Sequence, residues 1–247
     1  MEDPVGAALR GWLLGTRPPG RRDPETARDA VEAMLEANLD AQKLLQSGRQ
    51  PTMGVFGLAP VKPARPEARD EANLWDHVLW RSWSRVIEDG FIDLPWRGPV
   101  VDEILINAFD IIGVAYDHPL AVDVDSSFAA YPADARTDGS GFAPNAEELG
   151  AVLRRVAEML PDKQILVAAN GVTTDDDDWR DQLLRETIEQ VDLAIDDGVP
   201  VIGYHHDTAI DGYHESRGFA GKRGLITRDR EPKQSAVTYR SLATRQR

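Results

Sequence analysis

The chain has 247 residues, of which 42% are hydrophobic, and its formal net charge is −14. The length suits one large α/β domain or two small ones, and the hydrophobic share supports a buried core. The acidic balance argues against nucleic acid and anionic membranes as partners, because both need a basic surface. The absence of cysteine excludes disulfides, thiolate nucleophiles and cysteine-ligated metal sites.

The N-terminal segment Met1-Glu2-Asp3-Pro4 lacks the basic and apolar regions of a signal peptide. No apolar run approaches the roughly 18 residues that a membrane-spanning helix needs. We therefore expect a soluble protein of the cytoplasm, with no membrane partner.

Helices and strands alternate in the first half of the chain. Asp23-Pro24-Glu25 is a helix start, with an Asp cap and Pro at the first helical position, and Gly48 follows the helix end. A short apolar strand is expected at Met53–Leu58 and a helix at 68–88. The tryptophans of that helix form an apolar stripe that is typical of core packing. Phe109–Tyr116 is nearly all apolar, as expected of a strand that is covered on both faces.

The alternation continues in the second half, where the Asn-Gly turn that ends Ile165–Gly171 is the clearest strand terminus. The pattern predicts a polar loop at 117–144, a helix at 145–160, a strand at 165–171, a helix at 177–197, a strand at 199–204, a loop at 205–231 and a helix at 234–245. We interpret the acidic run Asp175–Asp178 as the solvated first turn of a helix rather than as a metal site.

Four predicted strands, near residues 54, 112, 167 and 202, alternate with helices over residues 1–247, which we treat as a single domain. This order is typical of a parallel sheet, which keeps its chemistry at the carboxyl ends of its strands. Four strands are half of an eight-stranded barrel.

Several segments resemble glycoside hydrolase family 1, the β-glucosidase family. Ile165–Gly171 resembles the family's I-T-E-N-G, and Asp197–Tyr204 resembles D-G-V-P-V-x-G-Y. Gly224-Leu225-Ile226 and Pro232–Ala236 resemble F-G-L and P-K-x-S-A, and Phe109–Asp117 resembles the D-F-I-G-x-N-x-Y strand. The likeness runs along the whole chain in the family's order.

The resemblance implies a TIM-barrel-derived half barrel of about four parallel strands with flanking helices. The family has an (β/α)₈ barrel, and the counterpart of its first four strands is not present in this sequence. A half barrel leaves strand edges unpaired, which proteins usually cover or pair. We therefore expect a homodimer or a partner chain that covers the edges; the alternative is a monomer that covers them itself.

The same resemblance implies that the catalytic residues are replaced. Retaining glycosidases need two carboxyl groups about 5–5.5 Å apart. The position of the nucleophilic Glu falls on Ala169, which cannot form a glycosyl ester, and the position of the acid/base Glu falls on Asp3. Further pocket positions of the family fall on Asp117, Asp207, His214 and Glu215.

The candidate site residues are therefore Asp3, Asp117, His205, Asp207, His214 and Glu215. Because side chains alternate along a strand, His205 should face the same side as Asp207, and His206 should face the other side. Imidazoles beside carboxylates can run acid/base chemistry near neutral pH. The same side chains could bind one divalent ion, or could simply be solvated in a decayed pocket. We assign no cofactor and no metal.

The sequence thus predicts a divergent relative of family 1 glycoside hydrolases that has lost retaining glycosidase activity. It would act on or bind a small polar or glycosylated metabolite, by His/Asp acid–base catalysis if it is an enzyme. The alternatives are a non-catalytic binding or scaffold protein, and one half of a split β-glycosidase whose partner supplies the remaining strands.

Overall fold

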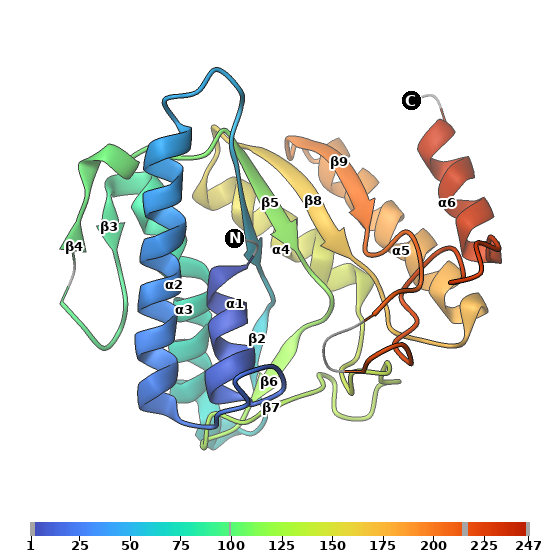
Figure 1. Cartoon of the computed structure of the whole chain (residues 1–247), viewed down its shortest axis with the longest axis horizontal. Helices are drawn as coiled ribbons and strands as arrows, with labels where there is room; N and C mark the ends of the chain where they lie inside the picture. The colour runs from blue at the N-terminus through green and yellow to red at the C-terminus, as the bar shows by residue number, and fades with distance from the viewer. Residues whose placement is uncertain (1–2, 99, 214–216, 246–247) are drawn as a thin grey trace.

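The protein is built on one sheet of four parallel strands. The structure is a computed structural model and describes residues 3–98, 100–213 and 217–245. The strands lie in the order β1-β5-β8-β9 (Figure 1), with bounds Met53–Gly57, Ile111–Ala115, Gln164–Asn170 and Val201–His206. The predicted half barrel of four parallel strands is confirmed, each strand within a few residues of its expected range.

Helices follow and precede these strands as the sequence predicted. Figure 1 shows α4 and α5 behind β5, β8 and β9, with α1 and α2 beside the β1 end of the sheet. No helix in the described part of the chain is both long and apolar enough to span a bilayer. The helices are α1 (Pro4–Ala8), which continues into a π-turn (Leu9–Leu13), α2 (Pro24–Leu45), α3 (Arg69–Asp89), α4 (Ala146–Met159), α5 (Asp177–Asp196) and α6 (Gln234–Thr244).

The predicted helix caps are present. The side chain of Asp23 accepts a hydrogen bond from the backbone N–H of Glu25 (3.1 Å), and Pro24 occupies the first helical position. The side chain of Asn145 accepts from the N–H of Glu148 (3.3 Å). These side chains satisfy N–H groups that the first helical turn leaves unpaired, which fixes where α2 and α4 begin.

The tryptophan stripe of α3 lies in the core, as predicted. The ring of Trp83 stacks on Phe56 of β1, with ring centroids 4.1 Å apart. Trp80 is fully buried, and its indole N–H donates to the carbonyl of Ala59 (3.0 Å). These contacts attach α3 to the outer face of β1.

Short strands that the sequence did not predict lie in the expected loops. β2 (Val61–Pro63), β6 (Leu120–Val122) and β7 (Phe128–Ala129) form a second sheet, and β3 (Phe91–Ile92) pairs with β4 (Val100–Val101). Single 3₁₀ turns occur at Pro66–Ala68 and Glu103–Leu105. Two or three residues show no periodicity, and β2 pairs with a strand almost sixty residues away, so local patterns could not reveal these pairings.

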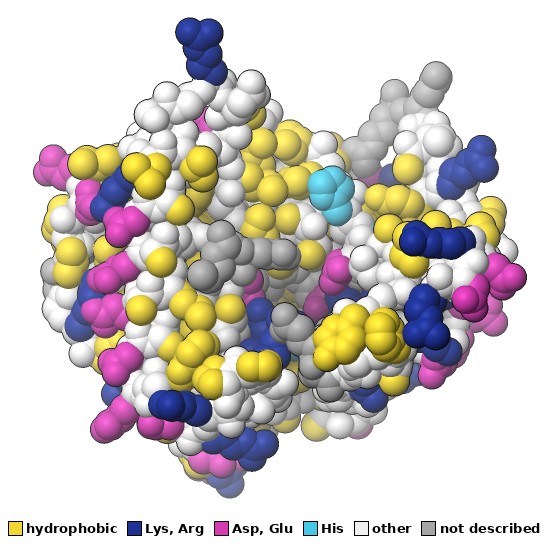
Figure 2. Space-filling model, viewed as in Figure 1, with side chains coloured by type: hydrophobic (Ala, Val, Ile, Leu, Met, Phe, Trp, Pro, Cys, Tyr) yellow, Lys and Arg dark blue, Asp and Glu magenta, His cyan; other side chains and the backbone are white. Residues whose placement is uncertain are grey.

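The two faces of the four-stranded sheet differ. Ile165 and Val167 of β8 are fully buried against the helices, whereas Leu166 and Ala168 between them are only half-buried. Val55 of β1 is also half-buried. We call the face that carries Val55, Leu166 and Ala168 the open face. Figure 2, in the same view as Figure 1, shows hydrophobic side chains over the sheet in the centre of the molecule.

Candidate functional site

The carboxyl ends of β8 and β9 meet at the turn that follows Asn170. The N–H of Asp207 donates to the carbonyl of Asn170 (2.8 Å). A Cβ on Gly171 would overlap the carbonyl oxygen of Asp207, so only glycine allows the two strand ends to approach this closely. The Asn-Gly turn of the sequence therefore positions Asp207 directly beside the end of β8.

Arg223 links two of the predicted site residues. Its Nη2 donates to Oδ1 of Asp117 (2.8 Å) and lies 3.0 Å from Oδ2 of Asp207. The Arg223 side chain is only 10% exposed, whereas those of Asp117 and Asp207 are 42% and 46% exposed. The loops after β5 and β9 thus bring two carboxylates to one guanidinium. Asp117 and Arg223 are 106 residues apart in sequence.

This ion pair sets the charge state of Asp117. Desolvation by itself would raise the pKa of the Asp117 carboxyl, but the charge and hydrogen bond of Arg223 outweigh it and hold the pKa below its ordinary value. Burial lowers the pKa of Arg223, but the carboxylates of Asp117 and Asp207 raise it by more, so the pKa is raised overall. Asp117 is therefore ionised at neutral pH and cannot serve as a proton donor there.

Asp3 lies in a different environment from Asp117 and Asp207. It is buried, caps α1, and its Oδ1 accepts from the N–H groups of Gly6 and Gly57, both at 3.0 Å. Arg10 Nη1 lies 2.9 Å from its Oδ2. Far from fraying, this segment is fixed to the end of β1, and the carboxylate of Asp3 is occupied by structural donors.

His205 and His206 point to opposite faces of β9, as the alternation predicted. His205 is exposed. The His206 ring approaches Tyr239 of α6, and its Nε2 lies 3.2 Å from the carbonyl oxygen of Arg223. Burial lowers the pKa of His206 to about 4, so it is neutral at pH 7. His205 is the imidazole of this pair that solvent can reach.

The remaining predicted positions add little to the described site. His214 and Glu215 lie outside the described residues. Ala169 is half-buried at the end of β8, and its carbonyl accepts from the N–H of Tyr116 (2.9 Å). A methyl group therefore stands at the position that the resemblance gives to a nucleophile.

A hydrogen-bond chain on the helix side holds the end of β8 in place. The hydroxyl of Tyr204 donates to Oδ1 of Asn170 (2.8 Å), and Nδ2 of Asn170 donates to the carbonyl of Tyr116 (2.7 Å). Burial raises the pKa of Tyr204 well above its ordinary range, so the hydroxyl keeps its proton and remains a donor. Asn170 is thereby bonded to both neighbouring strands.

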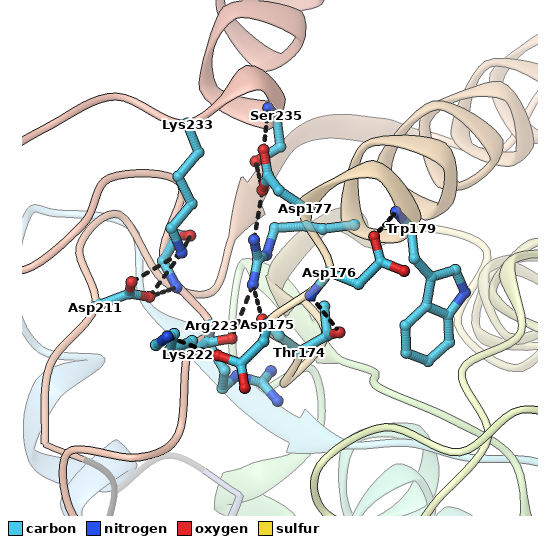
Figure 3. Close-up of polar contacts among 12 residues, drawn as sticks. Thr174, Asp175, Asp176, Asp177, Trp179, Asp211, Lys222, Arg223, Lys233 and Ser235 are labelled. Carbon is cyan, nitrogen blue, oxygen red and sulfur yellow. Dashed lines mark hydrogen bonds and ion pairs between the residues drawn. The ribbon is translucent and has the colours of Figure 1, made fainter.

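The scaffold residues of the resemblance have clear structural roles (Figure 3). Lys233 Nζ pairs with Asp211 (2.8 Å) and donates to the carbonyl of Gly224 (2.6 Å), which closes the loop after β9. The hydroxyl of Ser235 donates to Asp177 in the first turn of α5 (2.7 Å). The acidic run is therefore a helix start, in which the carboxylates of Asp175, Asp176 and Asp177 have protein partners and Asp178 is exposed. Among the described residues, no three His, Asp or Glu side chains are grouped to hold a metal ion.

Comparison with known proteins decides the family. The family model "Glycosyl hydrolase family 1" matches residues 122–247, half of the chain. The chain belongs to glycosyl hydrolase family 1. Of the six predicted site positions of this family 1 chain, four lie inside the matched region, and Asp3 and Asp117 lie outside it.

Relatives of this family 1 chain are enzymes of about twice its length. A "Beta-galactosidase" of Sulfolobus acidocaldarius is 26% identical over 85% of the chain, which spans 46% of that enzyme. A "1,4-beta-D-glucan glucohydrolase" of Thermotoga neapolitana is 25% identical over 92% of the chain and 60% of the enzyme. The chain thus spans about half the length of the curated relatives that it matches.

Solved structures show the same fold. A β-glycosidase from Pyrococcus horikoshii matches 98% of the chain and 59% of its own length, with a TM-score of 0.85 and 23% identity. A β-glucosidase from Thermotoga maritima, solved with a substituted glucoimidazole, matches 98% of the chain and 62% of its own length at a TM-score of 0.82 and 22% identity. At these identities the likeness establishes the fold alone.

Sequence reasoning missed Arg223, the residue that organises the site. The feature of the sequence that could have indicated Arg223 is a basic residue directly before Gly224. The candidate site residues of the same loop are acidic residues and histidines. A basic residue needs a carboxylate partner when it is buried. Which carboxylates it would contact depends on the fold of two loops, so the pairing could not be read from the chain.

Proposed function

We propose that this family 1 chain has lost retaining glycosidase chemistry and binds, and acts on, a small polar or glycosylated metabolite at the carboxyl ends of β8 and β9. Two features together support the proposal: residue 169 is an alanine, and the carboxylates of Asp117 and Asp207 are ion-paired with Arg223. Covalent hydrolysis needs a free nucleophilic carboxylate and a protonated acid. Ala169 supplies neither, and the carboxylates of Asp117 and Asp207, in the loops after β5 and β9, are paired with Arg223.

The cluster is suited to binding hydroxyl groups. The Asp117 and Asp207 side chains are nearly half exposed, and each carboxylate has a second oxygen that can accept a hydrogen bond. Because Arg223 is largely buried, it holds both carboxylates at fixed positions and keeps Asp117 charged. A polyhydroxylated ligand would find preorganised acceptors at this edge of the sheet.

His205 is the group that we propose for proton transfer. It is exposed and lies two residues before Asp207, and an imidazole is a general acid or base that proteins use near neutral pH. Asp3 is the less suitable candidate, since Gly6, Gly57 and Arg10 occupy its carboxylate.

The loss of hydrolysis is tested with nitrophenyl β-glucoside and β-galactoside. The purified chain is expected to release no nitrophenol above the background rate. Release that disappears in Ala-substituted Asp117 or Asp207 variants would overturn the proposal, because it would place a working carboxylate pair at this site.

The binding site is tested by titrating the chain with neutral monosaccharides and following chemical shifts by NMR. Asp207→Asn is expected to weaken binding about tenfold, the loss of one charge-assisted hydrogen bond. The matched control is Asp178→Asn, an exposed aspartate of α5, which should leave binding unchanged. Equal affinities for the two variants would remove Asp207 from the site.

A second candidate is one half of a split β-glycosidase. Two observations favour this candidate. The chain covers 46% of the Sulfolobus enzyme and 62% of the Thermotoga maritima enzyme, and the open face of the sheet, with Val55, Leu166 and Ala168, is only half-buried. For this candidate we expect the chain to form a stable complex when it is co-expressed with the first half of a family 1 enzyme. Retaining hydrolysis by that complex would also require Ala169→Glu, because Ala169 stands at the position of the nucleophile. Absence of any stable complex between the two halves would remove this candidate.

A further inference from the structure

A separate pocket lies beside the start of α5, outside the open face. Its volume is about 290 Å³, at the lower end of the range for small-molecule sites. The charged and aromatic residues of its wall are Arg136, Asp138, Asp175, Trp179, Arg217 and Lys222. Figure 3 shows Trp179, Asp175 and Lys222 at the start of α5 and in the neighbouring loop.

The wall of this pocket reverses the charge balance of the protein. The chain as a whole has 42 acidic and 28 basic residues, but three basic and two acidic side chains line the pocket. The basic residues come from the loops after β7 and β9, so the fold gathers them from distant segments.

Most charges of the wall already have partners. Lys222 pairs with Asp175 (2.7 Å), and Arg136 pairs with Asp176 (2.8 Å) while its guanidinium lies 3.9 Å from the ring centre of Trp179. Asp138 accepts hydrogen bonds from the backbone N–H groups of Thr173 (3.2 Å) and Ser140 (2.7 Å).

Arg217 differs from the other cations of the pocket. Within the described part of the chain, no carboxylate pairs with it. Its Nη1 lies against Gly139, where a side-chain Cβ would be 3.0 Å away, and the N–H of Gly139 donates to the carbonyl of Thr173 (2.6 Å). The guanidinium of Arg217 therefore lies against the backbone of Gly139, and within the described residues none of its N–H groups has a carboxylate acceptor.

We propose that this pocket binds the carboxylate of a small polyhydroxylated acid, such as a sugar acid, through Arg217. A guanidinium presents two parallel donors that match a carboxylate. Among the described residues of the pocket wall, Arg217 is the one cation without a carboxylate partner, which fits a single negative charge better than a dianion. The polar wall of Thr137, Thr173 and Thr174 supplies partners for hydroxyl groups. The site is independent of the proposed function, because Asp117, Asp207 and His205 do not line it.

The test is calorimetric titration of the full chain with sodium glucuronate at low ionic strength, with glucose and inorganic phosphate as comparators. Glucuronate is expected to bind, more tightly than phosphate, and glucose is expected not to bind at this pocket. Arg217→Gln should weaken glucuronate binding at least about tenfold. Lys222→Gln, which keeps the backbone carbonyl of residue 222, should weaken it by a smaller factor.

The matched control is Arg228→Gln, an exposed arginine of the same loop that lies over Phe219 and does not line the pocket. It should bind glucuronate as the unchanged chain does. Arg217→Gln should leave the binding of neutral monosaccharides unchanged, which separates this pocket from the open face. The inference is overturned if folded wild-type chain does not bind glucuronate, if Arg217→Gln binds it equally well, or if phosphate binds more tightly.

Discussion

At the scale of single residues, two adjacent histidines have opposite environments. His205 is exposed, whereas His206 is packed near Tyr239 and faces the backbone of Arg223. Burial is the main cause of the lowered pKa of His206, and the nearby charges of Arg223 and Arg180 act in the same direction, while Asp207 acts against them. The two imidazoles therefore differ in burial and in their protein contacts although they are adjacent in sequence.

We expect His206→Gln to remove part of the acid sensitivity of the fold. In the unfolded chain His206 takes up a proton as the pH falls through its ordinary pKa of 6.5, but in the folded chain it does so only near 4. The free energy of unfolding should therefore fall by about 2–3 kcal/mol between these values. Glutamine retains a donor for the carbonyl of Arg223. Urea unfolding at pH 7 and pH 5 measures the difference.

His205→Gln is the control, since an exposed side chain should leave this pH dependence unchanged. Identical pH profiles for the His205 and His206 variants would show that burial of His206 does not contribute to acid sensitivity.

At the scale of elements, the first turn of α5 joins three segments of the chain. Arg180 is fully buried, donates to the backbone carbonyls of Thr174 and Lys222, and pairs with Asp177. Asp177 in turn accepts from Ser235 at the start of α6. The helix start therefore fixes the loop that carries Arg223 and Lys222, next to both proposed sites.

Arg180→Met should destabilise the protein by about 3 kcal/mol, because it removes a buried guanidinium that bonds to Asp177 and to the carbonyls of Thr174 and Lys222. Arg154→Met, which breaks the exposed pair with Asp197 at 2.6 Å, should cost less than about 1 kcal/mol. Chemical denaturation measures both values. A small effect of Arg180→Met would mean that water replaces the guanidinium at this position.

At the scale of the whole molecule, the sheet ends in two strands that have only one neighbour each. In the described part of the chain, β1 and β9 each pair with a strand on one side only. Outside that pairing, Asp3 bonds to Val55 and Gly57 of β1, and the hydroxyl of Tyr239 donates to the carbonyl of Tyr204 in β9 (3.2 Å). Ile202 of β9 is 48% exposed. Unpaired strand edges with exposed apolar side chains favour association with another sheet.

We expect the purified chain to self-associate, with a dimer mass in light scattering at micromolar concentration and above. Ile202→Lys should shift the population towards monomer, because a charged side chain on an edge strand opposes pairing. The matched control is Leu193→Lys, since Leu193 is 44% exposed on α5. A monomer at every concentration would contradict this expectation and would favour edges that the chain itself covers.

The sequence alone was sufficient for the order of the main helices and strands and for the presence of Ala169, which has no carboxyl group, at the end of β8. Those features depend on local patterns: the Asp23 and Asn145 caps, the apolar run before Asn170-Gly171, and the side-chain type at Ala169. Neighbouring residues determine each of them, so the chain shows them directly.

Only the tertiary structure decided which side chains work together. Arg223 contacts Asp117 across 106 positions of sequence, Asp3 is bound to the end of β1, and Arg217 reaches a pocket whose other walls come from the loops around Asp138 and Trp179. Ion pairs and pockets depend on distances between segments that no local periodicity encodes. The family's scaffold was therefore predictable from the residues, whereas the ion pairs of Arg223 with Asp117 and Asp207 required the folded chain.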